Sequence, residues 1–232
     1  MVKQELIQRS PVRILEKSIH GGLGTGEVGI ISSPSGVGKT SVLVQLALDK
    51  LLQAKKVIHV SFTQHTDYIL AWYEDIFEEF THKKNLENVR DVKNELIKNR
   101  VLMNFNQDGV SSEQILRSLR AMIVDGGFQA EALIIDGFDF AKMTGERLAA
   151  TRDFARELGL SVWYSCTVKG EGAVYDKKNI PLVVGDFVEL VDVVIVLEPK
   201  QDHIALTVSK DRDRYNPEHL ALKLDPKTLL IL

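Results

Sequence analysis

A glycine-rich segment, 33–40, constrains the fold of this 232-residue chain more than any other feature of its sequence. An apolar run, 28–32, comes before it and an amphipathic stretch follows, so the pattern predicts a strand that turns through a loop into a helix. Glycines at positions 36 and 38 permit positive φ angles and let backbone N–H groups approach an anion closely. The order of residues fits the phosphate-binding pattern G-x-x-x-x-G-K-[ST] except at Ser33, which replaces the first glycine.

The loop therefore predicts a nucleotide-binding site that also holds Mg²⁺. We expect Lys39 to neutralise the β- and γ-phosphates and the Thr40 hydroxyl to ligate the metal. The helix that begins at Lys39 adds the positive end of its dipole. Serine at position 33 either tolerates the turn or alters it. A turn that binds nothing would not explain Gly-Lys-Thr after a strand. The residues expected to contact the nucleotide are Ser33, Pro34, Ser35, Gly36, Val37, Gly38, Lys39, Thr40 and Ser41.

A second run, 132–136, has the sequence Ala-Leu-Ile-Ile-Asp and predicts a buried strand that ends in a carboxylate. A charge at the end of so apolar a strand needs a partner. In phosphate-loop proteins that partner is Mg²⁺, with the loop threonine on its other side. Thr40 and Asp136 are therefore the predicted metal ligands. The alternative is that Asp136 only caps the following turn at Gly137.

Apolar runs and amphipathic stretches alternate along the chain, which predicts an α/β fold with a mostly parallel, twisted sheet flanked by helices. The length suits one domain. After residue 190 short apolar runs follow one another, so we expect an antiparallel extension on one sheet edge. Ligands of such sheets bind beyond the carboxyl ends of the strands. Strands are predicted at 28–32, 57–62, 101–105, 132–136, 161–167, 193–197, 204–209, 221–224 and 229–232, and helices at 39–53, 67–80, 89–98, 112–125 and 146–158.

Composition narrows the class of protein. A net charge of −3 argues against a protein that coats nucleic acid, although 29 Lys and Arg residues leave room for a local basic patch. The lone cysteine, Cys166, lies in an apolar run and is interpreted as a core residue of a protein in a reducing compartment. The apolar runs are too short to span a membrane. We therefore expect a cytoplasmic protein.

Four segments together resemble the RecA superfamily of ATPases, in particular its KaiC and RadA group. Residues 10–40 resemble that group's approach to the phosphate loop, with a Gly-Gly-Leu turn and a Gly-Glu pair before it. Asp136 resembles the Walker B aspartate, 189–197 resembles the sixth core strand, and 209–212, Ser-Lys-Asp-Arg, resembles the K-x-[RK] motif.

The resemblance covers about residues 10–232. It implies a RecA-like P-loop NTPase fold that binds ATP and Mg²⁺. It also implies a single domain, made of an N-terminal segment 1–26, a nucleotide-binding core 27–198 and a C-terminal β extension 199–232.

The resemblance further implies an active assembly of identical subunits, either a hexameric ring or a filament. In the family the basic pair of the K-x-[RK] motif reaches the neighbouring subunit's γ-phosphate and stabilises charge in the transition state. Here the pair is Lys210 and Arg212. Two residues apart on a strand, they would point to one face. The alternative is that 210–214 forms a solvated cluster whose charges compensate one another.

The loop after the second predicted strand departs from the family. Family members place a glutamate there to activate the attacking water, whereas this chain has Thr63, Gln64 and His65. Gln64 can orient water by hydrogen bonding but cannot take its proton. His65 is a second candidate base. The alternative is that His65 is an exposed loop residue where a helix begins. Two outcomes stay open, slow hydrolysis and binding without hydrolysis.

Two further regions bear on function. The predicted strand 161–167 ends where the family places a polar γ-phosphate sensor, which makes Ser165 and Thr167 candidates. The alternative is that they are ordinary strand-end residues. The loop 168–178 corresponds to the one through which recombinases hold DNA, but three lysines and one tyrosine make a weak nucleic-acid signal. We therefore expect a Mg²⁺-dependent ATPase that is active as an oligomer. The alternatives are a nucleotide-gated binding module without hydrolysis, a DNA recombination or repair factor, and a kinase. The sequence names no protein partner.

Overall fold

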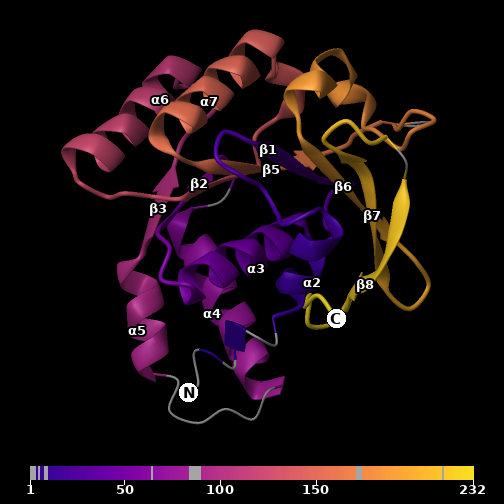
Figure 1. Ribbon diagram of the computed structural model, residues 1–232, viewed down its shortest axis with the longest axis horizontal. Coiled ribbons are helices and arrows are strands. Elements are labelled where there is room, and N and C mark those ends of the chain that lie inside the picture. Colours follow the sequence, from indigo (N-terminus) through magenta and orange to yellow (C-terminus); the bar gives the residue numbers. More distant parts are fainter. Residues whose placement is uncertain are drawn as a thin grey trace.

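The computed structural model describes residues 4, 6–7, 10–63, 65–83, 90–170, 174–215 and 217–232, and Figure 1 shows their arrangement. Within these residues one eight-stranded sheet has the strand order β3-β2-β4-β5-β1-β6-β7-β8. The strands are β1 (Val28–Ser33), β2 (Val57–Ser61), β3 (Arg100–Asn104), β4 (Ala132–Asp136), β5 (Ser161–Thr167), β6 (Val193–Pro199), β7 (Ile204–Asp211) and β8 (Glu218–Leu224). The helices are α2 (Pro11–Ser18), α3 (Lys39–Leu52), α4 (Thr66–Lys83), α5 (Arg90–Lys98), α6 (Ser112–Arg120), the π-helical turn η1 (Ala121–Asp125), the 3-10 helix η2 (Phe140–Lys142), α7 (Gly145–Leu158) and the 3-10 helix η3 (Leu182–Leu190).

The sheet is mixed and mostly parallel. Strands β3, β2, β4, β5, β1 and β6 run parallel to one another, whereas β6 pairs with β7, and β7 with β8, in the antiparallel sense. The prediction of an α/β sheet with an antiparallel extension at one edge is confirmed. β1 and β4 are buried along their whole lengths, as expected for parallel strands that are covered on both faces.

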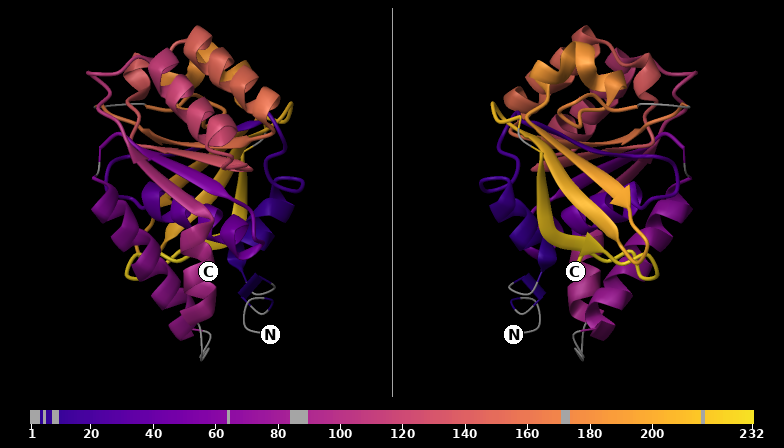
Figure 2. Two further views of the ribbon diagram at one scale, coloured as in Figure 1. Left: turned by 90° about the vertical axis from the view of Figure 1, so that its left-hand side faces the viewer. Right: turned by 90° about the vertical axis from the view of Figure 1, so that its right-hand side faces the viewer.

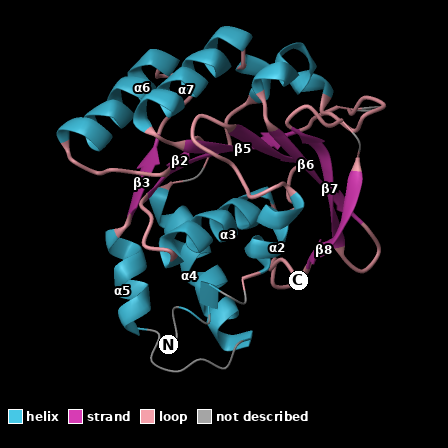
Figure 3. Ribbon diagram, viewed as in Figure 1, coloured by secondary structure: helices cyan, strands magenta, loops and turns pink. Residues whose placement is uncertain are grey.

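Helices cover both faces of the sheet (Figures 1 and 3). α2, α3, α4 and α5 lie on one face and α6 and α7 on the other, and the side views in Figure 2 show the same three layers. Successive strand residues alternate between the two cores. Ile134 belongs to the core that contains α3, and Ile135 belongs to the core under α6 and α7. Within the described ranges, no helix is long and apolar enough to cross a membrane.

Two helix boundaries follow the sequence signals for capping. Ser111 and Gln114 form a capping box at α6, in which the Gln114 N–H donates to Ser111 Oγ (3.3 Å) and the Ser111 N–H donates to Gln114 Oε1 (2.8 Å). Gly159, with a φ of 75°, ends α7 in the left-handed conformation. These local signals set where α6 begins and where α7 ends.

Four helical segments differ from the prediction, and three of them, α2, η2 and η3, were not expected at all. α2 begins at Pro11, a residue that suits the first turn because the N–H it lacks would have no helical partner; no helix was expected before Lys39. The predicted helix 112–125 is α-helical only to Arg120 and then continues as η1.

The predicted strand 229–232 is absent from the structure. Leu229 has a φ of 55°, and Ile231 makes one isolated bridge to β8. The backbone of this segment is held both by β8 and by α3. Leu232 and Lys223 exchange two backbone hydrogen bonds, and the Asp225 N–H donates to Leu230 O. Leu229 O accepts hydrogen bonds from the Ser41 hydroxyl and from the Gln45 side-chain amide, and the Ile231 N–H donates to Gln45 Oε1 at 2.9 Å. The C-terminal segment is therefore docked on β8 and on the helix that follows the glycine-rich loop.

Candidate functional site

A cleft of about 660 Å³ lies beyond the carboxyl ends of the parallel strands. Segments that follow β1, β2, β3, β4 and β5 all line it, as the rule for open α/β sheets predicts. We call 33–41 its first wall, and we call 106–108, 137–142 and 167–169 together its second wall. The predicted site residues that line the cleft are Ser35, Gly36, Gly38, Lys39, Thr40, Ser41 and Asp136.

The loop of the first wall adopts the conformation that its glycines permit. Gly36 has a φ of 78° and Gly38 a φ of 112°, both in the region that favours glycine. A Cβ atom on Gly38 would lie 2.6 Å from a methyl carbon of Leu224, so the turn also needs glycine for space. Among the described residues no side chain caps α3. A helix N-terminus of this kind favours an anion.

Ser33 fits the place of the missing glycine. It is the last residue of β1, it pairs with Thr167 of β5, and it is not one of the residues with a positive φ. The Ser33 hydroxyl donates to Pro34 O (2.9 Å). Lys39 Nζ donates to Ser33 O (3.1 Å), Ser33 Oγ (3.2 Å) and Pro34 O (2.8 Å). The serine therefore tolerates the turn and adds an acceptor for the lysine.

Lys39 is a buried cation at the edge of the cleft. The residue is 8% exposed, and its three hydrogen-bond acceptors are neutral oxygens. Burial lowers the pKa of Lys39, and the Asp136 carboxylate opposes that shift. A positive charge with neutral contact partners and little solvent attracts an anion.

The structure brings the two predicted metal ligands together. Thr40 Oγ1 donates to Asp136 Oδ2 at 2.8 Å, although the residues are 96 positions apart in the sequence. The turn after β4 has a different partner, because the Gly137 N–H donates to Ser165 Oγ at 2.8 Å. A hydroxyl beside a carboxylate is a pair of hard oxygen donors, the type that Mg²⁺ takes in addition to phosphate oxygens. Ser165 and Thr167, the candidate sensors, also line the cleft.

The second wall carries four polar residues to which sequence reasoning gave no role: Gln107, Asp108, Asp139 and Lys142. The Gln107 side chain binds both backbone groups of Asp139: the Asp139 N–H donates to Gln107 Oε1 (2.8 Å), and Gln107 Nε2 donates to Asp139 O (3.3 Å). Lys142 pairs with Asp108, and Lys169 Nζ lies 3.5 Å from Asp139 Oδ2. The signal that could have found these four residues is position, since they follow the predicted strands 101–105 and 132–136.

The loop after β2 is described only in part. Thr63 lines the cleft, and Gln64, the predicted water-orienting residue, lies outside the described residues. His65 pairs with Asp67 at 3.2 Å, and its side chain is 67% exposed. A Cβ atom on Gly137 would lie 2.3 Å from Thr63 Oγ1, so glycine lets the loops after β2 and β4 approach each other.

The expectation that Lys210 and Arg212 share one face of a strand is wrong. β7 ends at Asp211, and Arg212 follows it in a turn with a φ of 53°. Asp211 pairs with Val193, the first residue of β6, whereas the cleft lies beyond the last residues of the parallel strands. Both basic residues therefore lie near the amino ends of the parallel strands, whereas the cleft of their own chain lies beyond the carboxyl ends.

Both basic side chains are engaged within the chain. Lys210 is 4% exposed and donates to Val191 O. Arg212 donates to Glu27 through Nε (3.1 Å) and Nη2 (2.7 Å), to Asp211, and to the backbone carbonyls of Ile19 and Gly22. The alternative of a solvated, self-compensating charge cluster at 210–214 fits only part of this segment. Asp213 and Arg214 are exposed and Arg212 pairs with Asp211, whereas Lys210 and Asp211 are buried.

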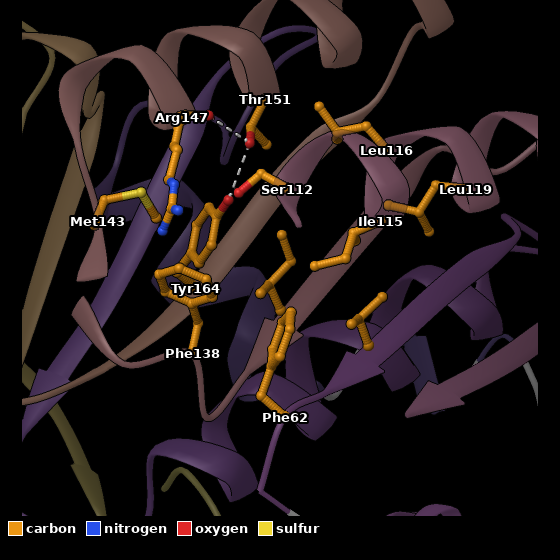
Figure 4. A pocket seen from close by; sticks show the side chains of 12 residues that line it. Phe62, Ser112, Ile115, Leu116, Leu119, Phe138, Met143, Arg147, Thr151 and Tyr164 are labelled. Carbon is orange, nitrogen blue, oxygen red and sulfur yellow. Dashed lines mark hydrogen bonds between the residues drawn. The ribbon is translucent and has the colours of Figure 1, made fainter. Parts of the chain in front are cut away.

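A smaller, apolar cavity of about 30 Å³ adjoins the cleft under α6 and α7 (Figure 4). Phe62 and Phe138 border both spaces, with their rings edge to face and the centroids 5.3 Å apart. At one end the Tyr164 hydroxyl donates to Thr151 Oγ1 (3.3 Å), which donates to Arg147 O (3.0 Å). A void of this size holds about one or two water molecules, so the larger cleft is the candidate site.

Comparisons of the sequence with protein-family models and with curated proteins gave no match. The functional argument therefore rests on the geometry of the cleft. Fold and site together define an α/β protein with a glycine-rich loop and a buried lysine at the carboxyl edge of a mostly parallel sheet.

Proposed function

We propose that this protein binds Mg²⁺-ATP in the cleft and hydrolyses it, as an ATPase similar to the KaiC and RadA group of the RecA superfamily. The observation that carries the proposal is the 2.8 Å contact between Thr40 and Asp136 beside the buried Lys39. Local structure does not explain a contact between residues 96 positions apart. The three residues have the chemistry that a Mg²⁺-nucleotide requires.

Each part of Mg²⁺-ATP has a matching group. The N–H groups of the loop and of the first turn of α3 would bind the β-phosphate, and Lys39 would contact the γ-phosphate in exchange for its loop acceptors. Thr40 and Asp136 would hold the metal. When bound, Mg²⁺ neutralises charge on the β- and γ-phosphate oxygens.

The cleft also has space and apolar surface for a base. Its volume of about 660 Å³ falls within the range of small-molecule sites, roughly 300–1,000 Å³. Trp72 of α4 and Leu229 of the C-terminal segment both line it. The guanine-selective pattern N-K-x-D does not occur in the sequence, which favours adenine.

The proposal includes catalysis between subunits. Lys210 and Arg212 lie at the sheet edge opposite the cleft, so a phosphate that they contact would be one bound by a neighbouring copy. A ring or a filament of identical subunits would allow this. Arg212 would first have to leave its contacts with Glu27 and Asp211. Turnover should then rise faster than linearly with protein concentration.

A second candidate function is a nucleotide-gated binding module without turnover. The feature that favours it is Thr63, which lines the cleft where family members carry the catalytic glutamate. Threonine cannot accept a proton from water at neutral pH. In this alternative bound ATP would stabilise an assembly that recruits another protein.

Equilibrium binding of a fluorescent ATP analogue, with and without Mg²⁺, tests the proposal together with ATP turnover over a wide range of protein concentration. We expect Mg²⁺-dependent binding by the wild type, at least 100-fold weaker binding by Lys39→Ala, which corresponds to about 2.7 kcal/mol, and turnover that the variant lacks. Binding without turnover would select the second candidate. Wild-type protein that does not bind Mg²⁺-ATP at millimolar concentration would contradict both.

A further inference from the structure

The second wall of the cleft carries a carboxylate, Asp139, to which the proposed function gives no role. Three aspartates line the cleft among the described residues. Asp136 accepts the Thr40 hydroxyl. Asp108 pairs with Lys142, and its side chain is 79% exposed. Asp139 is the remaining one.

The position of Asp139 is set by its neighbours, while its carboxylate keeps an exchangeable partner. Gln107 binds the backbone N–H and carbonyl of Asp139, and Asp139 Oδ1 accepts the Ala141 N–H at 3.3 Å. Oδ2 faces Lys169 at 3.5 Å, with side chains that are 36% and 71% exposed. An ion pair so exposed contributes at most about 1 kcal/mol, so Oδ2 can give up Lys169 for another partner.

Asp139 lines the same cleft as Lys39 and Thr40 of the glycine-rich loop. Asp139 also follows Asp136 by three residues, so their Cα atoms are at most about 11 Å apart. The Asp139 carboxylate therefore borders the space in which a nucleotide at the glycine-rich loop would place its terminal phosphate.

We infer that Asp139 orients the attacking water and accepts its proton when ATP is hydrolysed. This inference rests on the proposed function, and it supplies the carboxylate that Thr63, Gln64 and His65 do not offer. Gln107 is the positioning residue, because its amide fixes the backbone from which the carboxylate extends.

In the reaction the water oxygen bonds to the γ-phosphorus, and the bond between that phosphorus and the β,γ-bridging oxygen breaks. The electron pair of the broken bond stays on the bridging oxygen, so the products are ADP and inorganic phosphate. The proton that water loses passes to the Asp139 carboxylate and from there to solvent.

A matched pair of variants tests this role. Asp139→Asn keeps the side-chain shape and an acceptor for the Ala141 N–H, but an amide cannot take a proton. Asp176→Asn is the control, because Asp176 also accepts backbone N–H groups of the turn that follows it, although that turn comes after β5 and not after β4. It accepts the N–H groups of Lys178 (2.9 Å) and Ile180 (2.8 Å), and it does not line the cleft.

Three quantities are measured for each variant: Mg²⁺-ATP affinity, single-turnover rate, and retention of ADP with aluminium fluoride, a mimic of the transferring phosphoryl group. We expect Asp139→Asn to keep Mg²⁺-ATP affinity within about threefold, to lose at least 100-fold in rate and to retain little of the ADP–aluminium fluoride complex. Asp176→Asn should match the wild type. Gln107→Ala should lower the rate by a smaller factor and leave affinity unchanged.

Equal rates for Asp139→Asn and its control would overturn the inference. A loss of affinity as large as the loss of rate would also overturn it, because Asp139 would then be a binding residue. Wild-type protein that binds Mg²⁺-ATP without hydrolysing it would overturn the role of Asp139 and leave the nucleotide site in place. Failure of the wild type to bind Mg²⁺-ATP would instead remove the proposed function.

Discussion

Two basic side chains that the sequence connects with phosphate, Lys39 and Arg212, have opposite electrostatic surroundings. Lys39, at the carboxyl ends of the parallel strands, donates to neutral oxygens of the glycine-rich loop. Arg212, at the amino edge, donates to the carboxylates of Glu27 and Asp211 and to two backbone carbonyls. Carboxylates cancel a positive charge, whereas neutral acceptors only orient it. Lys39 is thus arranged to receive an anion, and Arg212 is arranged to hold distant segments of the chain together.

The pKa values of the two groups shift in opposite directions. Burial lowers the pKa of Lys39, and the Asp136 carboxylate only opposes that shift. Burial also acts to lower the pKa of Arg212, but its bonds to Glu27 and Asp211 outweigh burial and raise the pKa. The folded protein therefore disfavours the charged form of Lys39 and favours that of Arg212.

The largest expected effect on stability separates the two residues. Arg212→Ala removes five hydrogen bonds and the cation that pairs with Glu27, whereas Asp211 keeps its contact with His20. We expect the free energy of unfolding in urea to fall by about 3 kcal/mol, the low end for a buried ion pair, because the Arg212 and Glu27 side chains are 30% and 25% exposed. Mg²⁺-ATP affinity should change less than about threefold, since Arg212 does not line the cleft.

The control for this prediction is Arg117→Ala, which removes an exposed arginine from α6. Its effect on the free energy of unfolding should stay within about 0.5 kcal/mol. If Arg212→Ala changed stability no more than this control, the network at the amino edge would not be what joins these segments, and the contrast with Lys39 would fail.

A backbone substitution disturbs the surroundings of Lys39 without removing its charge. Gly38→Ala adds a Cβ atom at a φ of 112° and 2.6 Å from Leu224. We expect a loss of about 2 kcal/mol in the free energy of unfolding and at least tenfold weaker binding of Mg²⁺-ATP. Gly145→Ala is the control, since a Cβ atom there meets nothing within 4 Å. Equal effects of the two substitutions would show that the loop tolerates an ordinary residue at position 38.

The residues of the first wall could be predicted from the sequence because the patterns that mark them are short and contiguous. The loop residues 33–40 are contiguous, and Asp136 ends an apolar run, so two short patterns and the rule for parallel sheets place both at one edge. The sheet class followed for the same reason, because alternating apolar and amphipathic stretches are local signals.

The place of Arg212 and the residues of the second wall depend on contacts between segments that are distant in the sequence. No local sequence pattern indicates such contacts. The prediction that Lys210 and Arg212 share one face assumed that β7 continues past Asp211. The strand ends at Asp211 because that residue pairs with Val193, the first residue of β6. The second wall was missed for a similar reason. Gln107 and Asp139 carry no motif, and only the parallel pairing of β3 with β2 and of β2 with β4 brings their loops together.

The C-terminal segment shows the same limit. Residues 229–232 have the composition of a strand, and sequence reasoning treated them as one. In the structure Ser41 and Gln45 of α3 bind the backbone of Leu229, which adopts a left-handed conformation instead. The segment keeps backbone hydrogen bonds to β8 at Leu232 but forms no regular strand, because the left-handed conformation at Leu229 interrupts the extended backbone.

A smaller effect tests whether Lys39 is a functional rather than a structural cation. Lys39→Met keeps the length of the side chain and removes a buried charge whose contact partners are neutral. Without nucleotide, we expect the free energy of unfolding to rise by about 1 kcal/mol, the opposite sign to Arg212→Ala. Mg²⁺-ATP should raise the melting temperature of the wild type and leave that of Lys39→Met unchanged. A destabilisation as large as that of Arg212→Ala would place both cations in the same structural class.

The smallest expected effect is a pH dependence that only Lys39 should show. Folding lowers the pKa of Lys39 below 10.5, so between the lowered pKa and 10.5 the unfolded chain binds more protons than the folded protein. Stability from this group therefore rises with pH in that window. The difference in the free energy of unfolding between Lys39→Met and wild type should narrow from about pH 8 to about pH 10, as measured in urea.

Arg212 provides the internal reference for this measurement, because its guanidinium stays protonated in both states over the same range. The difference between wild type and Arg212→Ala should therefore stay constant from about pH 8 to about pH 10. If the Lys39→Met difference were equally constant, folding would not change the proton affinity of Lys39. The charge of Lys39 would then be as well compensated as that of Arg212. The electrostatic argument that the glycine-rich loop binds an anion would fail.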